Sequence, residues 1–269
     1  MHVALLGRND FSASFIVEGI NAPLANTLRR IVLSEVPTMA IDDVMIYENS
    51  SVLHDEILAL RLGLIPLKTD LDSYNLPERC SCKSNLGCPL CRVILTLDVE
   101  AKEGVRTVYS GDLISENPNV APVSDKIPIV KLAAGQRVRL EAYAKLGRGK
   151  DHAKWQPVSA CIYRYKPIVK IDQSRCNVCG KCVEYCSRRV LAKDGDKIVV
   201  AREMDCVLCN DCIRVCEVKP PPIQISWDNN SFIFYVESIG SLPVERIMFE
   251  ALKIYEEKFT EFMNLLEGV

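Results

Sequence analysis

Cysteine placement limits what this chain can fold into more than any other feature of its sequence. The 269 residues include 13 cysteines, and all but Cys161 fall into three groups of four. Tetrahedral metal ions and iron–sulfur clusters each take four thiolates, so the grouping indicates metal binding. Paired disulfides are the alternative. The N-terminal residues lack the basic segment and apolar core of a secretory signal, and the reducing compartment that we therefore expect disfavours disulfides.

Composition narrows the class of protein further. Apolar residues make up 48% of the chain and charged residues 25%, which is the balance of a globular protein. The formal net charge of −2 argues against a chain-wide basic surface for nucleic acid. No apolar run reaches the roughly 18–20 residues that span a bilayer. We expect a cytoplasmic chain of two or three folding units, with little or no nucleic-acid contact and no membrane contact.

The two later cysteine groups share one spacing. Residues 176–186 read C-N-V-C-G-K-C-V-E-Y-C and residues 206–216 read C-V-L-C-N-D-C-I-R-V-C, so both are C-x2-C-x2-C-x3-C. With this spacing three thiolates of one loop bind one iron–sulfur cube, and the fourth cysteine ligates the other cluster. The sequence therefore predicts two [4Fe–4S] clusters. The first cluster would bind Cys176, Cys179, Cys182 and Cys216. The second cluster would bind Cys206, Cys209, Cys212 and Cys186.

The segments that flank these runs complete a small domain. Residues 167–171, 198–201 and 222–226 read as short strands, and Asp194-Gly195-Asp196 reads as a turn. Residues 166–226 resemble the two-cluster bacterial ferredoxins, although Ser187 and Glu217 stand where that family usually has proline. This departure bears on the cluster potentials and not on the ligands. Two roles remain open: the clusters stabilise a unit too small for its own core, or they serve redox sensing or electron transfer.

Helices are predicted outside this domain by the spacing of apolar residues. One covers residues 21–36, with Asn21 or Ala22 near its cap and Pro23 in its first turn; a shorter one covers residues 55–62. Near the C-terminus, a helix of about 243–266 carries a heptad seam of Met248, Leu252, Tyr255, Phe259, Phe262 and Leu266. Such a seam needs a partner, which is either this chain's own early helix or another subunit.

The first cysteine group has a different spacing and predicts a different site. Cys80, Cys82, Cys88 and Cys91 form two short pairs, and ligand pairs of this kind suit a tetrahedral zinc ion. Paired disulfides and free thiols are the alternatives at this loop. The remaining cysteine, Cys161, lies in an apolar run and reads as a buried thiol.

Longer segments resemble a known family. Residues 26–31, 36–44 and 55–67 are similar to the assembly-platform subunit of multisubunit RNA polymerases, whose bacterial form is the alpha subunit N-terminal domain. Residues 146–158 and 240–246 resemble further hallmarks of the archaeal and eukaryotic branch. A ferredoxin insert between such segments is typical of the archaeal members of this family. Eukaryotic relatives carry a zinc loop where this chain has residues 80–91, with a shorter central gap.

The resemblance implies an α+β fold in three parts. A discontinuous alpha-subunit-like dimerisation domain would cover residues 1–47 and 226–269, and an inserted mainly β domain would cover 48–165, with the four-cysteine loop at 80–91. A ferredoxin-like iron–sulfur domain would cover 166–225. The implied partners are RNA polymerase subunit L, in a heterodimer, and then the large and small polymerase subunits. The implied interface residues are Leu24, Leu28, Arg29, Arg30, Ile31, Met248, Leu252, Tyr255, Phe259 and Phe262.

Two functions compete for this sequence. The first is a non-catalytic scaffold for archaeal DNA-directed RNA polymerase, because no histidine, Ser or Cys forms a catalytic constellation and no G-K-[ST] follows Gly147 and Gly149. Its clusters would stabilise the insert and couple assembly to redox state or oxygen. The second is an electron-transfer subunit of an oxidoreductase, which the segments at 26–31 and 147–158 disfavour. The pair Arg29 and Arg30, taken without the family, also fits a solvated helix face.

Overall fold

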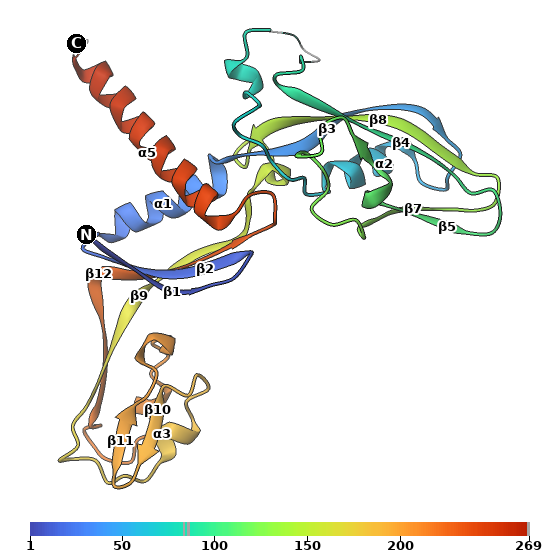
Figure 1. The fold of residues 1–269 in the computed structure, drawn as a ribbon. Coiled ribbons are helices and arrows are strands. Elements are labelled where there is room, and N and C mark those ends of the chain that lie inside the picture. The colour runs from blue at the N-terminus through green and yellow to red at the C-terminus, as the bar shows by residue number, and fades with distance from the viewer. Residues whose placement is uncertain (83, 85–86, 268–269) are drawn as a thin grey trace. The chain divides into compact units, whose positions relative to one another are not determined.

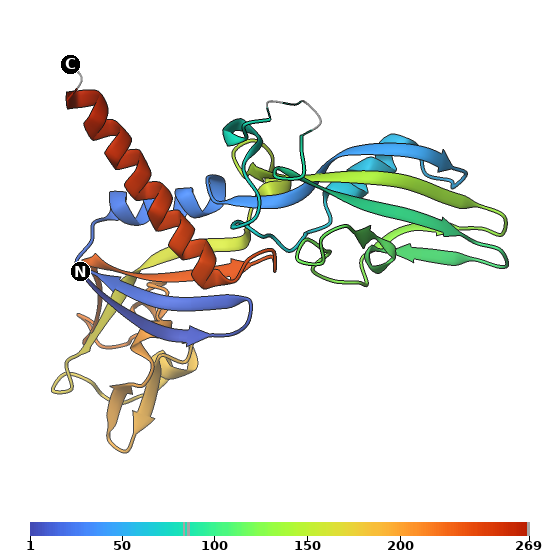
Figure 2. The same cartoon turned by 45° about the horizontal axis from the view of Figure 1, so that its top comes forward.

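The computed structural model describes residues 1–82, 84 and 87–267 (Figures 1 and 2). The fold is mixed α/β and mostly sheet, and the chain divides into two compact units built from segments far apart in the sequence. Unit 1 comprises Met1–Gly7, Ser14–Asn26 and Ile162–Phe234. Unit 2 comprises Arg8–Ala13, Thr27–Cys161 and Tyr235–Val269.

Unit 2 is organised by an antiparallel sheet of four strands in the order β3-β8-β4-β6. Its strands are β3 (Pro37–Asn49), β8 (Arg137–Arg148), β4 (Arg92–Glu100) and β6 (Ile114–Ser115). A separate hairpin pairs β5 (Arg106–Tyr109) with β7 (Pro128–Leu132). Bulges in β3 between Ile41 and Asp43 and between Ile46 and Glu48 shift its register against β8. Such bulges bend a strand and increase its twist.

The core of unit 2 lies on one face of this sheet. Strand β4 alternates strictly, with Val93, Leu95, Leu97 and Val99 buried, as expected for a strand with one face on the core. Helix α2 (Asp55–Gly63) adds the fully buried Leu58 and Leu62. The predicted helix over 55–62 is therefore confirmed. Four short 3-10 helices complete the connections in the described part of the chain: Pro77–Arg79, Ser110–Asp112, Ala153–Trp155 and Glu203–Asp205.

Two helices match the apolar stripes in the sequence. Helix α1 (Ala22–Ser34) is capped by Asn21, whose Oδ1 accepts from the Leu24 amide at 3.0 Å. Helix α5 runs over Val244–Glu267. Both helices were predicted, and Asn21 is the capping residue because its short side chain reaches the free amides of the first turn. In α5 only Val244, Ile247 and Ala251 are buried, all within its first turns.

Unit 1 contains a second four-stranded sheet in the order β1-β2-β12-β9. Its strands are β1 (His2–Arg8), β2 (Ser12–Glu18), β12 (Ile223–Ser238) and β9 (Val158–Ile171). Aromatic rings hold it together: Phe15 stacks on Phe234 at 5.4 Å, and Tyr163 meets Phe232 edge-on at 5.5 Å. Strands β9 and β12 continue from this sheet into the cysteine-rich part (Figure 1). The short strands predicted at 167–171 and 222–226 are thus the ends of these two long strands.

The cysteine-rich part of unit 1 is small and internally repeated. It holds the hairpin of β10 (Leu191–Asp194) and β11 (Lys197–Val200), closed by Gly195 with φ of 55°, which is the predicted turn. Two short helices, α3 (Lys181–Glu184) and α4 (Asp211–Arg214), follow equivalent places in the two cysteine runs. The core here consists of Val169, Cys182, Val190, Leu191, Ile198, Cys206, Cys212 and Ile223.

Candidate functional site

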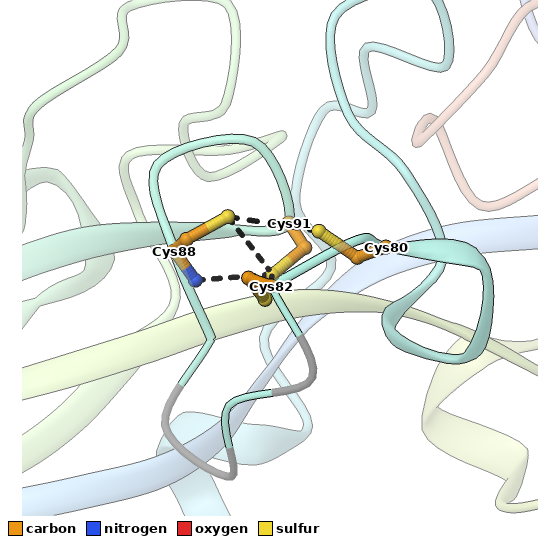
Figure 3. A group of neighbouring side chains, drawn as sticks. All are labelled: Cys80, Cys82, Cys88 and Cys91. Atoms are coloured by element: carbon orange, nitrogen blue, oxygen red, sulfur yellow. Dashed lines mark hydrogen bonds between the residues drawn. The ribbon is translucent and has the colours of Figure 1, made fainter.

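The four cysteines of the 80–91 loop converge on one point (Figure 3). All four Sγ atoms lie within 4.8 Å of one another, and the Cys80–Cys88 and Cys82–Cys91 separations are 3.6 and 3.8 Å. A tetrahedral zinc ion, with Zn–S bonds of about 2.3 Å, would hold its sulfurs about 3.8 Å apart. A disulfide needs about 2.05 Å, and all four thiols are free. The geometry therefore fits one metal ion, and in this structure the four cysteines are free thiols that no disulfide joins.

Backbone hydrogen bonds shape this loop around the sulfurs. The amides of Cys91 and Arg92 both donate to the Cys88 carbonyl, and the Cys88 amide donates to Cys91 Sγ at 3.1 Å. Gly87 precedes this turn with φ of 77°, and a Cβ there would lie 3.1 Å from Cys91 Sγ. The left-handed backbone favours glycine here, and the close approach of the sulfur leaves little room for a larger side chain. The second ligand pair is thus a tight knuckle that leads directly into β4.

Two of the four thiols, Cys82 and Cys91, differ strongly in pKa. The Ser84 amide, followed by the Cys80 thiol, lowers the pKa of Cys82 to about 7. Burial raises the pKa of Cys91 to about 12. Four thiolates this close repel one another, so full ionisation requires a positive charge at their centre. A divalent cation would supply that charge, and the donor set is one that zinc prefers.

The two later runs adopt the same backbone conformation. Val178 and Leu208 have φ of 54° and 60°, and Gly180 and Asn210, two residues on, have φ of 82° and 63°. A left-handed conformation costs a residue other than glycine about 1–2 kcal/mol. Val178, which is β-branched, adopts this conformation least readily. Such strained loops persist only where further interactions hold them, and ligation of a cluster is an interaction of that kind.

Burial and neighbouring thiols raise the pKa of one central cysteine in each of the two later runs. Burial, followed by the charges of Cys176, Cys179 and Cys216, raises the pKa of Cys182. Burial also raises the pKa of Cys212 to about 11, and the charges that act with it are those of Cys186, Cys206, Cys209 and Cys182. Each central thiol thus interacts with the fourth cysteine of the other run. One cavity is lined by Cys186, Cys206, Cys209 and Cys212 among others.

The spacing of their ligand atoms, and not their exposure, distinguishes these thiols from the 80–91 group. Cys182, Cys206 and Cys212 are buried, whereas Cys179 and Cys209 are exposed. In the described part of the chain, only the 80–91 group brings its ligand atoms close enough for a single ion.

The outer part of α5 exposes a long apolar surface. Phe259 and Phe262 are 53% and 55% exposed, and Phe249, Leu252, Met263, Leu265 and Leu266 are exposed as well. A groove between α5 and α1 is lined by Thr27, Arg30, Ile31, Ser34, Glu35, Tyr255, Lys258, Phe259 and Phe262. Exposed apolar surface of this kind is typical of sites that bind another protein.

The structure places the predicted interface residues on these two helices with different exposure. Ile31 is buried, while Leu24, Leu28, Arg29, Met248 and Tyr255 are half-buried. The exposed members are Arg30, Leu252, Phe259 and Phe262. The exposed members are therefore accessible to a partner, and the half-buried ones present part of their side chains.

An acidic residue joins the two helices at this groove. The Glu35 carboxylate accepts from Lys258 of α5 at 2.9 Å and lies 3.2 Å from Lys150. Burial acts to raise the pKa of Glu35, but the hydrogen bonds and charges of Lys258 and Lys150 lower it overall. This residue was not predicted from the sequence, because nothing local to position 35 indicates two lysines from distant segments.

The glycine-rich segment at 146–158 braces the end of α1. A Cβ on Gly147 would lie 2.4 Å from the Trp155 ring, and one on Gly149 would lie 2.3 Å from the Leu33 carbonyl. Lys154 stands 4.4 Å from the centre of the Trp155 ring and pairs with the half-buried Asp42. The segment therefore fixes α1 against β3 and β8. Resemblance identified this motif, but only the structure gives the reason for its glycines.

Comparison with known proteins identifies a family for this chain. The RNA polymerase Rpb3/Rpb11 dimerisation domain matches residues 14–259. A relative from Archaeoglobus fulgidus, DNA-directed RNA polymerase subunit Rpo3, is 43% identical over 99% of this chain and 98% of its own length. Relatives of the same name from Methanosphaera stadtmanae and Methanothermobacter thermautotrophicus are 42% and 39% identical, over 99% and 100% of this chain and 98% and 100% of their own lengths.

The family match covers most of the two helices on which the exposed apolar surface lies. The matched residues include α1 and most of α5, on which the apolar groove lies. No helix in the described residues is long and apolar enough to cross a membrane. With a family match over most of its length and relatives that align from end to end, this chain belongs to the Rpb3/Rpb11 dimerisation-domain family of RNA polymerase subunits.

Proposed function

We propose that this chain is the assembly-platform subunit of an archaeal DNA-directed RNA polymerase. It pairs first with a smaller L-type partner and then receives the large catalytic subunits, while the chemistry belongs to those other chains. The observation that carries the proposal is the exposed apolar surface of α5 beside α1, within the family's dimerisation domain. Electron transfer remains the weaker function, since an electron carrier has no use for this surface.

The proposed domains follow from this role. The dimerisation domain comprises residues 1–47 and 226–269, the middle domain 48–165, and the ferredoxin-like domain 166–225. The last domain binds two [4Fe–4S] clusters, through Cys176, Cys179, Cys182 and Cys216 and through Cys206, Cys209, Cys212 and Cys186. Support comes from the matched loops of the two runs and from the electrostatic grouping of their thiols. The 80–91 loop binds zinc.

When bound, the clusters supply folding free energy to a domain with a small core. The eight cysteines hold them, and the flanking strands β9 and β12 return the chain to the dimerisation domain. Loss of the clusters therefore weakens contacts that the insert makes with the large subunits, and leaves the heterodimer intact. Assembly would in this way depend on oxygen or redox state.

The dimer surface is tested by charge substitution. Leu28→Glu with Phe259→Glu places two carboxylates on the α1–α5 surface and should abolish co-purification with the L-type partner, while the visible absorbance of the clusters stays. Val105→Glu is the matched control, because Val105 is 74% exposed, belongs to unit 2 and does not line the groove. A double variant that still binds the partner with full affinity would place the interface elsewhere.

The metal content is tested by anaerobic purification. The proposal expects about eight iron and eight sulfide per chain for two [4Fe–4S] clusters, and about one zinc for one four-thiolate site. Cys209→Ser and Cys82→Ser serve as reciprocal controls: the first should reduce iron and leave zinc, and the second should reduce zinc and leave iron. About four iron in the unaltered chain would remove one cluster from the proposal.

A further inference from the structure

One arginine fastens the second cysteine run to strand β9. Arg164, on β9, donates through Nη1 to the Cys206 carbonyl at 2.9 Å and through Nη2 to the Met204 carbonyl. From the other direction, the Glu203 carboxylate accepts from the Val169 amide of the same strand at 2.8 Å. The segment that carries the first ligand of this run is therefore bound to β9 at both of its ends.

The first run lacks an equivalent of this half-buried guanidinium. Its cations lie at the rim: Lys193 donates to the Val178 carbonyl at 3.3 Å, and Lys181 pairs with Glu217. The second run also has a rim cation, Arg214, which donates to the Cys209 carbonyl at 2.8 Å. Exposed cations of this kind are screened by water and salt. In the described residues, no cationic side chain donates to the carbonyl of Cys176, the counterpart of Cys206.

Further charges surround Arg164 and partly offset one another. Asp205 attracts it and Arg188 repels it. Asp205 also lies 3.6 Å from the exposed Arg202, which donates to the Arg188 and Arg189 carbonyls. Arg188 and Arg189 themselves are exposed. The immediate surroundings of the second run are therefore rich in guanidinium groups, of which only Arg164 is half-buried.

Charge near an iron–sulfur cluster changes its reduction potential. A cluster with four thiolates is an anion that gains a further negative charge on reduction, so a fixed cation in a half-buried position favours the reduced form. We propose that Arg164 is a positioning residue for the second cluster: it holds Met204–Cys206 against β9 and sets the potential of this cluster above that of the first. This inference rests on the proposed function, because it requires both clusters.

The test is a redox titration of the anaerobic heterodimer, followed by electron paramagnetic resonance. Each cluster takes one electron from dithionite, and no protein bond forms or breaks. Two steps are expected, and Cys209→Ala should remove or alter the step of higher potential. Arg164→Met should shift that step to lower potential and leave the other in place. Arg164→Lys keeps the positive charge and should therefore leave the potential of the higher step close to its value in the unaltered protein.

Matched variants and iron analysis separate the outcomes. Lys181→Met, beside the first run, should not move the higher step, because its ammonium is exposed and already paired with Glu217. If Arg164→Met fails to load a cluster, Arg164→Gln provides a neutral side chain that still donates to a carbonyl. The inference would be overturned if the neutral variants left both potentials unchanged or shifted both equally. It would also be overturned if Arg164→Lys lowered the potential of the higher step as much as Arg164→Met does. Fewer than eight iron in the unaltered chain would instead refute the two-cluster proposal.

Discussion

Two hydrophobic cores in the described part of the chain differ in the residues that form them. The core of unit 2 gathers 22 buried residues from β3, β4, β8, α2, the β5–β7 hairpin and their connections, and none of them is a cysteine. The core of the cysteine-rich part has eight buried residues, of which Cys182, Cys206 and Cys212 are proposed ligands. We expect a core of the first kind to be stable by burial alone, and a core of the second kind to need the clusters that we propose for its cysteines.

The largest expected effect is loss of the cysteine-rich part on removal of iron. Chelation or exposure to oxygen should abolish amide-exchange protection in β10 and β11, because five aliphatic residues cannot hold the strained loops of the two runs. Protection in β3, β4 and β8 should remain. The measurement is hydrogen–deuterium exchange of the heterodimer before and after iron removal. Protection that persists in β10–β11 would show that the small core stands without its clusters.

The second effect is the cost of a cavity in either core. Leu95→Ala removes a fully buried side chain from the middle of β4 and should destabilise unit 2 by about 2–5 kcal/mol. Ile198→Ala, at a position 1% exposed in β11, serves as the matched variant in the small core. With the clusters bound, Ile198→Ala should increase amide exchange in the cysteine-rich part alone. If either substitution loosened both cores equally, the two would not be independent.

The features predicted correctly from the sequence are those whose chemistry is local. The cap at Asn21 and the Asp194–Asp196 turn are each determined by a few neighbouring residues, and the structure contains both of them. The assignment of Cys216 to the cluster of Cys182 stays a prediction from the motif, whose spacing sends the fourth thiolate to the other cluster.

Features that depend on distant contacts could not be predicted. The order β3-β8-β4-β6 and the continuation of β9 and β12 through both parts of unit 1 depend on which strands meet in space. Arg164 reads in sequence as one charge in an alternating strand, and its role depends on carbonyls some forty residues away. Gly147 reads as a loop residue, although it is required by the Trp155 ring.

A third prediction concerns the proposed zinc site, which differs from the proposed clusters in holding a single ion. In the zinc-free chain, alkylation of Cys82 should rise steeply around pH 7, because its thiol is exposed and the Ser84 amide stabilises the thiolate. Cys91, buried and with a pKa of about 12, should stay unreactive at neutral pH. Mass spectrometry of alkylated peptides measures both. Added zinc should protect all four thiols; equal reactivity of Cys82 and Cys91 would contradict the geometry of the loop.

The smallest expected effect concerns the contact between α1 and α5. Lys258→Met removes one of two cations at Glu35 and should cost about 0.2–1 kcal/mol at pH 7, since Lys258 is half exposed and exposed ion pairs contribute little. The pKa of Glu35 is lowered by folding, so this stabilisation is present above the unfolded value of 4.5 and is lost as the pH falls through the folded value. The difference between variant and unaltered protein should therefore vanish in acid. Exchange of the Glu35 amide, which donates to the Ile31 carbonyl at the end of α1, reports the effect within unit 2. Lys253→Met on the same helix is the control, because no ion pair of Lys253 occurs in the described residues; an equal loss there would assign the effect to helix composition and not to the ion pair.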